Sequence, residues 1–234
     1  SVRATYIASM SAESVVYKGL MLASQLGAFY PDLHDPRVIS SFALFHQRYA
    51  TNTLPDWRLA QPLRKIAHNG EINTLGSNVS WMEARGVETL GDMWEAARQD
   101  VLPVISSHGS DSAALDEVFD LLTSSGIGPI RSMMTLIPEA WERFPDMDAE
   151  LRSFYRYHAA AMEPWDGPAT VAFHNGEVVG VATDRNGLRP ARYQTTVDGL
   201  IVCASEAGVL DLAPSNLAES GQLGPGQVLA VDLA

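Results

Sequence analysis

The sequence predicts an α+β domain in which antiparallel sheets are covered by helices. Three observations support this prediction. Segments typical of short strands occupy both ends of the chain, and the segment between them has helical spacing. The chain has 234 residues, 46% of them hydrophobic, so it is long enough to bury a substantial core. It contains no internal repeat and no low-complexity linker, so we expect one domain over residues 1–234.

Two short elements are predicted in the first 45 residues. Residues 5–8 and 14–17 are rich in β-forming side chains and flank a turn of small residues, which predicts a hairpin. Further along, Asp35 and Pro36 precede an apolar run that ends at Phe45. This order predicts a short helix, with Asp35 as its N-cap and Pro36 at its first position.

Helices are predicted in the middle of the chain, as an insertion over about 78–161. Apolar residues recur at helical spacing from Val79 to Met82 and from Leu115 to Leu122. Ser110 or Asp111 stands where the cap of the later helix belongs.

From residue 169 onward the sequence favours short strands separated by turns that contain Gly and Asn. The predicted strands cover residues 170–173, 178–182, 200–203 and 228–231. Residues 174–177 contain Asn-Gly and predict a tight hairpin turn between the first two strands. Strands, then helices, then strands again are typical of the α+β class.

Charge and composition exclude several classes of function. The net charge of −12 argues against a nucleic-acid partner. A single cysteine, Cys203, excludes an internal disulfide framework and a multi-cysteine metal site. No apolar run is long enough to span a membrane, and the first residues lack the pattern of a signal peptide. We therefore expect a cytoplasmic globular protein with no membrane partner.

Three clusters of polar and glycine residues interrupt the apolar sequence and are candidate sites. They are residues 46–53, 67–73 and 109–112. Each cluster also has a structural interpretation. Arg48 could form a surface ion pair, Asn69-Gly70 could be a hairpin turn, and Ser110-Asp111 could be a helix cap.

Together the clusters supply groups that bind a free amino acid and cleave its side-chain amide. The planar guanidinium of Arg48 suits an α-carboxylate, and the carboxylate of Asp111 suits an α-ammonium group. The Asn69 side-chain amide and the Gly70 N–H could together bind a tetrahedral oxyanion. No nucleophile is apparent among these residues.

Longer strings, in the same order along the chain, resemble the class II glutamine amidotransferases. These strings are HQRYATNT, AHNGEINT, HGSDS, EPWDGPA, DRNGLRP and ASEAG. The strings FYPDL, TLPDW and NVSWMEARG are similar to the glutamate synthase family in particular. This resemblance implies an N-terminal-nucleophile hydrolase fold, a four-layer αββα sandwich of two stacked antiparallel sheets.

The resemblance also implies a role for each candidate residue. Arg48 would bind the carboxylate of L-glutamine, Thr51 would belong to the same binding set, and Asp111 would bind the ammonium group. Asn69 and the Gly70 N–H would form the oxyanion hole. The nucleophile of this family is an N-terminal cysteine whose own α-amino group acts as general base.

The sequence departs from the family at this nucleophile. Residue 1 is a serine followed by Val2 and Arg3, whereas the family has a Cys-Gly motif upstream of the first string. Cys203 lies in the apolar run 200–203 and is interpreted as a core residue. We therefore expect a partial amidotransferase domain, incomplete at its N-terminus, that binds glutamine and does not turn it over.

For the whole enzyme the resemblance implies a glutamate synthase. Ammonia released from glutamine would reach 2-oxoglutarate in a synthase domain of the same polypeptide and form a second glutamate. FMN and an iron–sulfur cluster would lie outside this chain, and a small NADPH-oxidising subunit is a further expected partner. No metal site is expected here, because His46 and His68 lack a third ligand at a suitable spacing.

Two alternatives remain open at this stage. The first is a regulatory domain that keeps the fold and binds an amino acid without catalysis. The second concerns residues 184–190, which could be either a solvated turn or a structural loop near the site.

Overall fold

The computed structural model describes residues 6–48, 56–89, 92–106 and 109–234. The α-helices are α1 (Leu26–Phe29), α2 (Leu75–Thr89), α3 (Arg98–Val101), α4 (Asp111–Ser124), α5 (Pro129–Leu136) and α6 (Ala149–Ala159). The strands are β1 (Ile66–Gly70), β2 (Ala169–His174), β3 (Val178–Thr183), β4 (Arg192–Thr196), β5 (Ile201–Ala204), β6 (Leu217–Gln222) and β7 (Val228–Asp232). Short 3₁₀ helices cover Ala23–Gln25, Pro31–His34, Asp92–Ala97, Trp141–Arg143 and Pro214–Asn216.

The strands form two antiparallel sheets. The first has the order β1-β2-β3-β7 and the second has the order β5-β4-β6. The turn between β2 and β3 is the predicted Asn-Gly hairpin. Its Asn175 Oδ1 accepts the N–H groups of Glu177 and Val178, and Gly176 has a φ of 100° that favours glycine.

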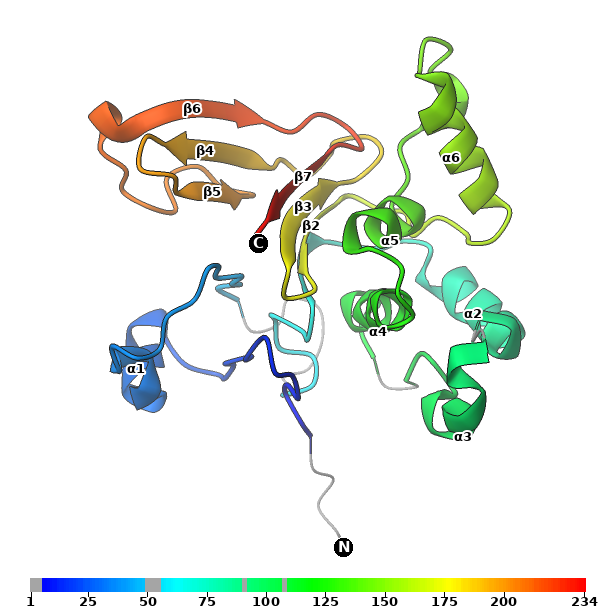
Figure 1. The fold of residues 1–234 in the computed structure, drawn as a ribbon, viewed down its shortest axis with the longest axis horizontal. Helices are drawn as coiled ribbons and strands as arrows, with labels where there is room; N and C mark the ends of the chain where they lie inside the picture. The colour runs from blue at the N-terminus through cyan, green and yellow to red at the C-terminus, as the bar shows by residue number, and fades with distance from the viewer. Residues whose placement is uncertain (1–5, 49–55, 90–91, 107–108) are drawn as a thin grey trace, which may run out of the picture.

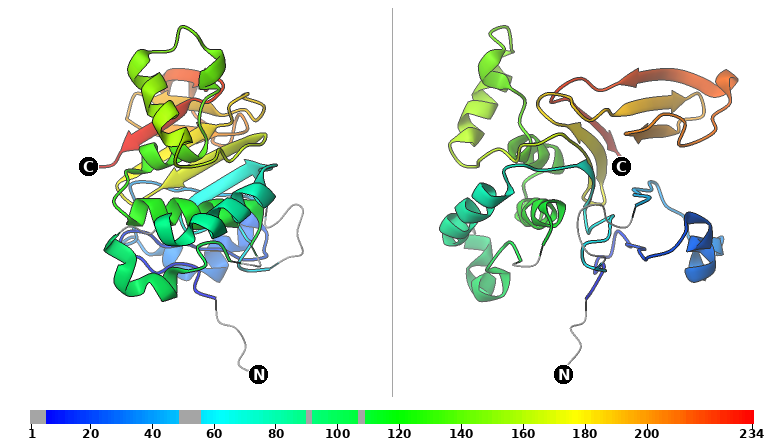
Figure 2. Two further views of the ribbon diagram at one scale, coloured as in Figure 1. Left: turned by 90° about the vertical axis from the view of Figure 1, so that its right-hand side faces the viewer. Right: turned by 180° about the vertical axis from the view of Figure 1, so that it is seen from behind.

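Alternate residues of the four-stranded sheet face two different cores. Val171 and Phe173 of β2 are fully buried against helix α4, where the rings of Phe173 and Phe119 lie 5.6 Å apart. Ala172 and Val181 face the other way and pack with Tyr193 of the second sheet. The layers therefore run from helices through the four-stranded sheet to the three-stranded sheet, as Figures 1 and 2 show. The α+β class with two stacked antiparallel sheets is confirmed.

Both elements predicted near the N-terminus are wrong. Residues 6–17 form no strand, because local hydrogen bonds hold a turn in which Ser11 Oγ accepts the N–H groups of Glu13 and Ser14. No helix begins at Pro36 either. Asp35 instead ends the 3₁₀ helix Pro31–His34, and its carboxylate binds the N–H and guanidinium of Arg37.

The apolar residues beyond Arg37 are too exposed to stabilise a helix. Val38 is 49% exposed and Ile39 is 88% exposed, so an amphipathic helix there would bury little surface. A helix this short needs tertiary packing along one face to form, and the exposed Val38 and Ile39 do not supply that packing.

Helices α2 to α6 lie between Leu75 and Ala159, in the middle segment where the sequence predicts helices. All four predicted strands after residue 169 are also present, as β2, β3, β5 and β7. Strands β1, β4 and β6 were not predicted. In the described ranges, no helix has the length and apolar character that crossing a membrane requires.

Candidate functional site

Strand β1 carries Asn69 and Gly70 at the edge of the four-stranded sheet. The two residues pair with Thr170 and Ala169 of β2 in an antiparallel ladder. The hairpin-turn interpretation of Asn69-Gly70 is therefore wrong, because both residues end a strand instead of connecting two.

The ladder register sets the direction of the Gly70 N–H. The N–H of His174 donates to the carbonyl of Lys65, and the N–H of Glu71 donates to the carbonyl of Pro168. Lys65 and His174 therefore form one hydrogen-bonded pair of the ladder, and Glu71 and Pro168 form another. Hydrogen-bonded and non-hydrogen-bonded pairs alternate along an antiparallel ladder, which places Gly70 in a non-hydrogen-bonded pair. Its N–H consequently points away from β2, toward the outer edge of the sheet.

Backbone packing explains why residue 70 is glycine. Its φ is 133°, a conformation that side chains rarely adopt, and a Cβ there would lie 1.9 Å from the carbonyl oxygen of Pro168. Glycine therefore lets two backbones approach closely at this position. The requirement for glycine is structural, and within the described residues the Gly70 N–H has no hydrogen-bond partner.

The Asn69 side chain lies on the opposite face of β1 from His68 and points toward the second sheet. Its Nδ2 donates to Ser205 Oγ at 3.0 Å. An amide nitrogen carries two hydrogens, so one remains available after this bond. Ser205 lies within the ASEAG string, but no spacing rule linked it to Asn69, which is 136 residues away.

Asp111 reaches the end of β1 from the first position of helix α4. Its Oδ2 accepts the N–H of Ile72 at 2.9 Å, two residues beyond Gly70. The N-cap of this helix is Ser110, whose Oγ accepts the N–H of Ala113 at 3.1 Å. Of the two candidate caps, Ser110 is therefore correct, and the Asp111 carboxylate has a different structural contact.

Asp116, one and a half turns further along α4, holds the beginning of β1. Its buried carboxylate accepts the N–H groups of Arg64, Lys65 and Ile66 at 3.1, 2.8 and 3.0 Å. Burial raises its pKa to about 6, although these donors favour the charged form. Two carboxylates of one helix thus fix both ends of the strand that carries Asn69. Nothing in the sequence pattern indicated this role for Asp116.

Two histidines lie near the same end of β1. His68 is buried, and this burial lowers its pKa, while the negative charge of Asp111 opposes the shift. The positive charges of His46 and Arg189 also act on His68, so His46 lies in this neighbourhood. Among the described residues, no group of three or more metal-binding side chains is placed to hold an ion.

Arg48 and Thr51 are less completely placed. Arg48 is exposed, and its carbonyl oxygen lies 2.7 Å from Nδ1 of His46. Within the described ranges Arg48 forms no ion pair, so the surface ion-pair interpretation gains no support there. Thr51 lies outside the described residues. The structure therefore brings Asn69, Gly70 and Asp111 together and leaves the Arg48 guanidinium unassigned.

Residues 184–190 form a structural loop beside the site. The buried carboxylate of Asp184 accepts the N–H groups of Asn186, Leu188 and Arg189. Thr170, the ladder partner of Asn69, donates its hydroxyl to the carbonyl of Arg189 at 3.1 Å. The loop is thus tied to the strand next to Asn69, which supports the structural-loop alternative over a solvated turn.

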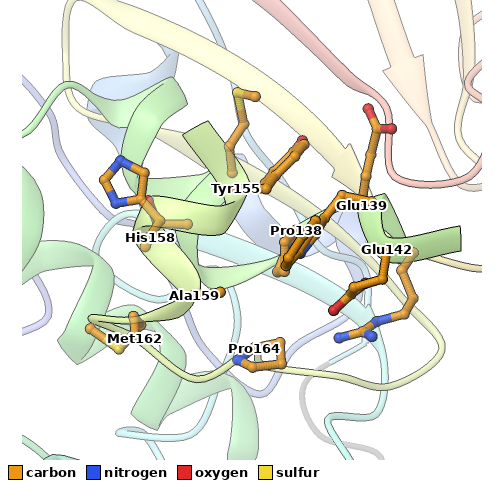
Figure 3. A pocket seen from close by; sticks show the side chains of 12 residues that line it. Pro138, Glu139, Glu142, Tyr155, His158, Ala159, Met162 and Pro164 are labelled. Carbon is orange, nitrogen blue, oxygen red and sulfur yellow. The ribbon is translucent and has the colours of Figure 1, made fainter. Parts of the chain in front are cut away.

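Two hollows in the described surface do not have Asn69 among their lining residues. Figure 3 shows one of about 40 Å³ beside α6, with Glu139, Tyr155 and His158 among its lining residues. A second of about 90 Å³ lies over Asp116, between Tyr6 and the start of α4. A single water needs roughly 10–15 Å³ of such space, so the smaller hollow suits a few waters and not an amino acid.

Comparisons with known proteins identify the relatives of this chain. The sequence profile of the class-II glutamine amidotransferases matches residues 1–234. The ferredoxin-dependent glutamate synthase of Pyropia yezoensis is 46% identical over 97% of this chain and 15% of its own length. The glutamate synthase [NADPH] large chain of Bacillus subtilis is 44% identical over 97% of this chain and 15% of its own length. The chain thus spans about one seventh of these relatives.

A solved structure shows a weaker likeness. The glutamine phosphoribosylpyrophosphate amidotransferase of B. subtilis, in complex with ADP and GMP, aligns with a TM-score of 0.44 and 18% identity. The alignment covers 80% of this chain and 32% of that structure.

Proposed function

The chain belongs to the class-II glutamine amidotransferases, and from this premise we propose that it is the glutamine-hydrolysing part of a glutamate synthase. The similarity to glutamate synthases over 97% of the chain supports this assignment within the family. Residues 1–234 then form part of an amidotransferase domain within a longer polypeptide. L-glutamine is the substrate, and glutamate and ammonia are the products.

One structural observation carries the proposal. The Gly70 N–H points to the outer edge of β1, directly after the residue whose side-chain amide has a hydrogen to spare. Two neutral donors on adjacent residues suit an oxyanion that exists only in the tetrahedral intermediate. Asp111, anchored at Ile72, supplies a carboxylate for the substrate ammonium group, and Arg48 supplies a guanidinium for its carboxylate.

In the proposed reaction, a cysteine thiolate adds to the side-chain amide carbon of glutamine. The carbonyl oxygen becomes an oxyanion and accepts hydrogen bonds from Asn69 and Gly70. The C–N bond then breaks, and ammonia leaves with a proton that the general base took from the thiol. Water hydrolyses the resulting thioester, which releases glutamate and restores the thiol.

The nucleophile in this proposal is a cysteine outside residues 1–234. Cys203 does not suit the role, since it is half-buried in β5 and burial raises its pKa to about 11. Residues 1–234 alone should therefore bind glutamine without hydrolysing it. The alternative, an amino-acid-binding domain without catalysis, predicts the same absence of hydrolysis in the complete protein.

The remaining chemistry belongs to other parts of the proposed enzyme. Ammonia would add to 2-oxoglutarate in a synthase domain, where FMN and an iron–sulfur cluster would pass two electrons from an external donor to the product and so reduce it to glutamate. The residues of this chain do not fit such a cluster, because its single cysteine cannot provide the several thiolates required. The small NADPH-oxidising subunit and the cytoplasmic location stay predictions.

Substitution of Asn69 tests the proposal. In the complete enzyme, Asn69→Ala should lower the kcat for glutamine hydrolysis by about 10²–10³, because it removes one oxyanion donor. The KM for glutamine should stay within about threefold, since the ground-state carbonyl gains little from this donor. Glutamate formation from added ammonia should survive, because that step uses a different site.

The same variant separates catalysis from a structural role. If Asn69 only supports the end of β1, the substitution should lower the melting temperature and reduce both activities in parallel. That parallel loss would remove Asn69 from the catalytic machinery. Unchanged glutamine hydrolysis would contradict the proposed mechanism directly.

A further inference from the structure

The contact between Asn69 and Ser205 joins the two sheets at the candidate oxyanion hole. Asn69 ends β1 of the four-stranded sheet, and Ser205 directly follows β5 of the three-stranded sheet. Ala204 pairs with Arg192 in the register of β5 and β4, so the ladder fixes the position of Ser205. The 3.0 Å bond from Asn69 Nδ2 to Ser205 Oγ therefore couples the Asn69 amide to the second sheet.

An oxyanion donor needs a fixed orientation that the backbone of Asn69 alone does not impose. The terminal torsion of an asparagine side chain is broad, so the amide plane can rotate and can exchange its oxygen for its nitrogen. Rotation by half a turn would present the carbonyl oxygen to the substrate oxyanion and would repel it. A hydrogen bond that holds one N–H of the amide leaves the second N–H in a fixed direction.

We propose that Ser205 is the positioning residue for the oxyanion donor Asn69. Its hydroxyl accepts one amide hydrogen and holds the other in the direction of the adjacent Gly70 N–H. Ser205 touches no reacting atom in this proposal, which rests on the proposed function of Asn69. The three-stranded sheet thereby contributes to catalysis although β1 carries both donors.

Three variants of Ser205 and Asn69 in the complete enzyme test this role. Ser205→Ala removes the acceptor and should lower the kcat for glutamine hydrolysis about tenfold, the value of one hydrogen bond, with the KM within about twofold. Ser205→Thr keeps the hydroxyl and should restore the kcat to within about threefold of the original. On the Asn69→Ala background, Ser205→Ala should change the kcat by less than about twofold, because no amide remains to be positioned.

Two further measurements exclude a general loss of structure. Ser220 lies exposed on β6 of the same sheet, so Ser220→Ala is a matched control and should leave both the kcat and the melting temperature unchanged. Glutamate formation from added ammonia should be equal in all these proteins, because it does not need the oxyanion hole.

The outcomes separate this inference from the function on which it rests. If Asn69→Ala lowers the kcat and Ser205→Ala does not, Ser205 is no positioning residue and the proposed function stands. Equal effects of Ser205→Ala on both backgrounds would also overturn the inference, since they would show that Ser205 acts independently of Asn69. If Asn69→Ala itself leaves the kcat unchanged, the proposed function fails first.

Discussion

Neighbouring residues at the start of α4 have separable roles that two substitutions can distinguish. Asp111→Asn keeps an oxygen that can accept the Ile72 N–H and loses the negative charge. We expect the KM for glutamine to rise about tenfold or more, because the substrate ammonium group loses its charged partner. Steady-state kinetics of the complete enzyme, with the melting temperature of the same sample, check this prediction.

Ser110→Ala is the matched control for Asp111→Asn. It removes the N-cap oxygen that accepts the Ala113 N–H, so stability should fall by about 1 kcal/mol while the KM for glutamine changes little. If Asp111→Asn instead lowers stability and leaves the KM unchanged, the carboxylate serves only to hold Ile72.

Arg48 is the candidate partner of the substrate carboxylate. Arg48→Lys keeps the charge and loses the planar fork, so we expect kcat/KM for glutamine to fall by the equivalent of about 2–4 kcal/mol. Activity with added ammonia should remain. Unchanged glutamine kinetics alongside a loss of ammonia-dependent activity would place Arg48 at another site.

At this scale the sequence predicted the groups that we propose to bind or polarise a substrate, but not the residues that hold them. The sequence was sufficient to select Asn69, Gly70 and Asp111, because each stands in a short motif whose residue types indicate its chemistry. Ser205 and Asp116 could not be selected, because their partners lie 136 and about 50 residues away and depend on sheet stacking and helix docking. In the sequence alone, a serine or an aspartate at such a position is equally compatible with an exposed polar surface.

Among the elements, helix α4 fixes strand β1, and the titration of Asp116 makes this contact sensitive to pH. The pKa of Asp116 in the folded protein is about 6, above the value of about 3.9 in an unfolded chain. The folded state therefore binds this proton more tightly than the unfolded state. The resulting stabilisation is complete below the unfolded pKa and is lost as pH rises through about 6.

Denaturation at two pH values tests this dependence. Between about pH 4.5 and about pH 7.5, the unfolding free energy should fall by roughly 2 kcal/mol more in the original protein than in Asp116→Asn, which cannot titrate. Asp116→Asn should also be less stable overall at low pH, because one amide oxygen cannot serve three N–H donors. Parallel pH profiles in the two proteins would contradict the assigned pKa.

The segment after β1 is held against residues 166–168 by close backbone contact. A Cβ at Gly167 would lie 2.0 Å from the carbonyl oxygen of Glu71, and the carbonyl of Asp166 accepts the N–H of Asn73 at 2.7 Å. Gly167→Ala must separate these backbones and should destabilise the protein by about 2–4 kcal/mol. Gly76→Ala in α2 meets nothing within 4 Å and should stabilise by about 0.5–1 kcal/mol. Equal melting temperatures for the two variants would show that this contact is relaxed in solution.

Secondary-structure elements were predictable from the sequence where their apolar residues are also the residues that the fold buries. The apolar strands β2, β3 and β7 have residues that pack on one of the two cores, so their β-rich sequences were sufficient. Strands β4 and β6 consist mainly of polar residues such as Gln194 and Ser220, so their side-chain pattern does not predict the antiparallel ladder that they form. The apolar run after Pro36 was misread as a helix because Val38, Ile39 and Phe45 are exposed, so the run does not bury a continuous apolar face.

In the whole molecule, two hydrophobic clusters of different size join different layers. The larger core joins the helices to one face of the four-stranded sheet, and a much smaller cluster around Val181, Ala191 and Leu223 joins the two sheets. The alternation of strand residues predicts that both faces are buried, but it does not tell which layer covers which face. The position of Ser205 over Asn69 depends on that smaller cluster, so the site is a property of the stacked sheets.

Cys203 lies at this junction of the sheets, and its reactivity tests whether residues 1–234 contain a nucleophile. Burial raises its pKa from about 9 to about 11, which lowers the thiolate fraction near pH 8 by about 100-fold. Alkylation by iodoacetamide in the folded protein should be slower than that of free cysteine by a similar factor, and unfolding in denaturant should restore the ordinary rate. In the complete enzyme, Cys203→Ala should retain glutamine hydrolysis, because the thiol packs with Tyr193 and forms no part of the oxyanion hole. Rapid alkylation of Cys203 that glutamine prevents, together with loss of hydrolysis in Cys203→Ala, would instead make Cys203 the nucleophile.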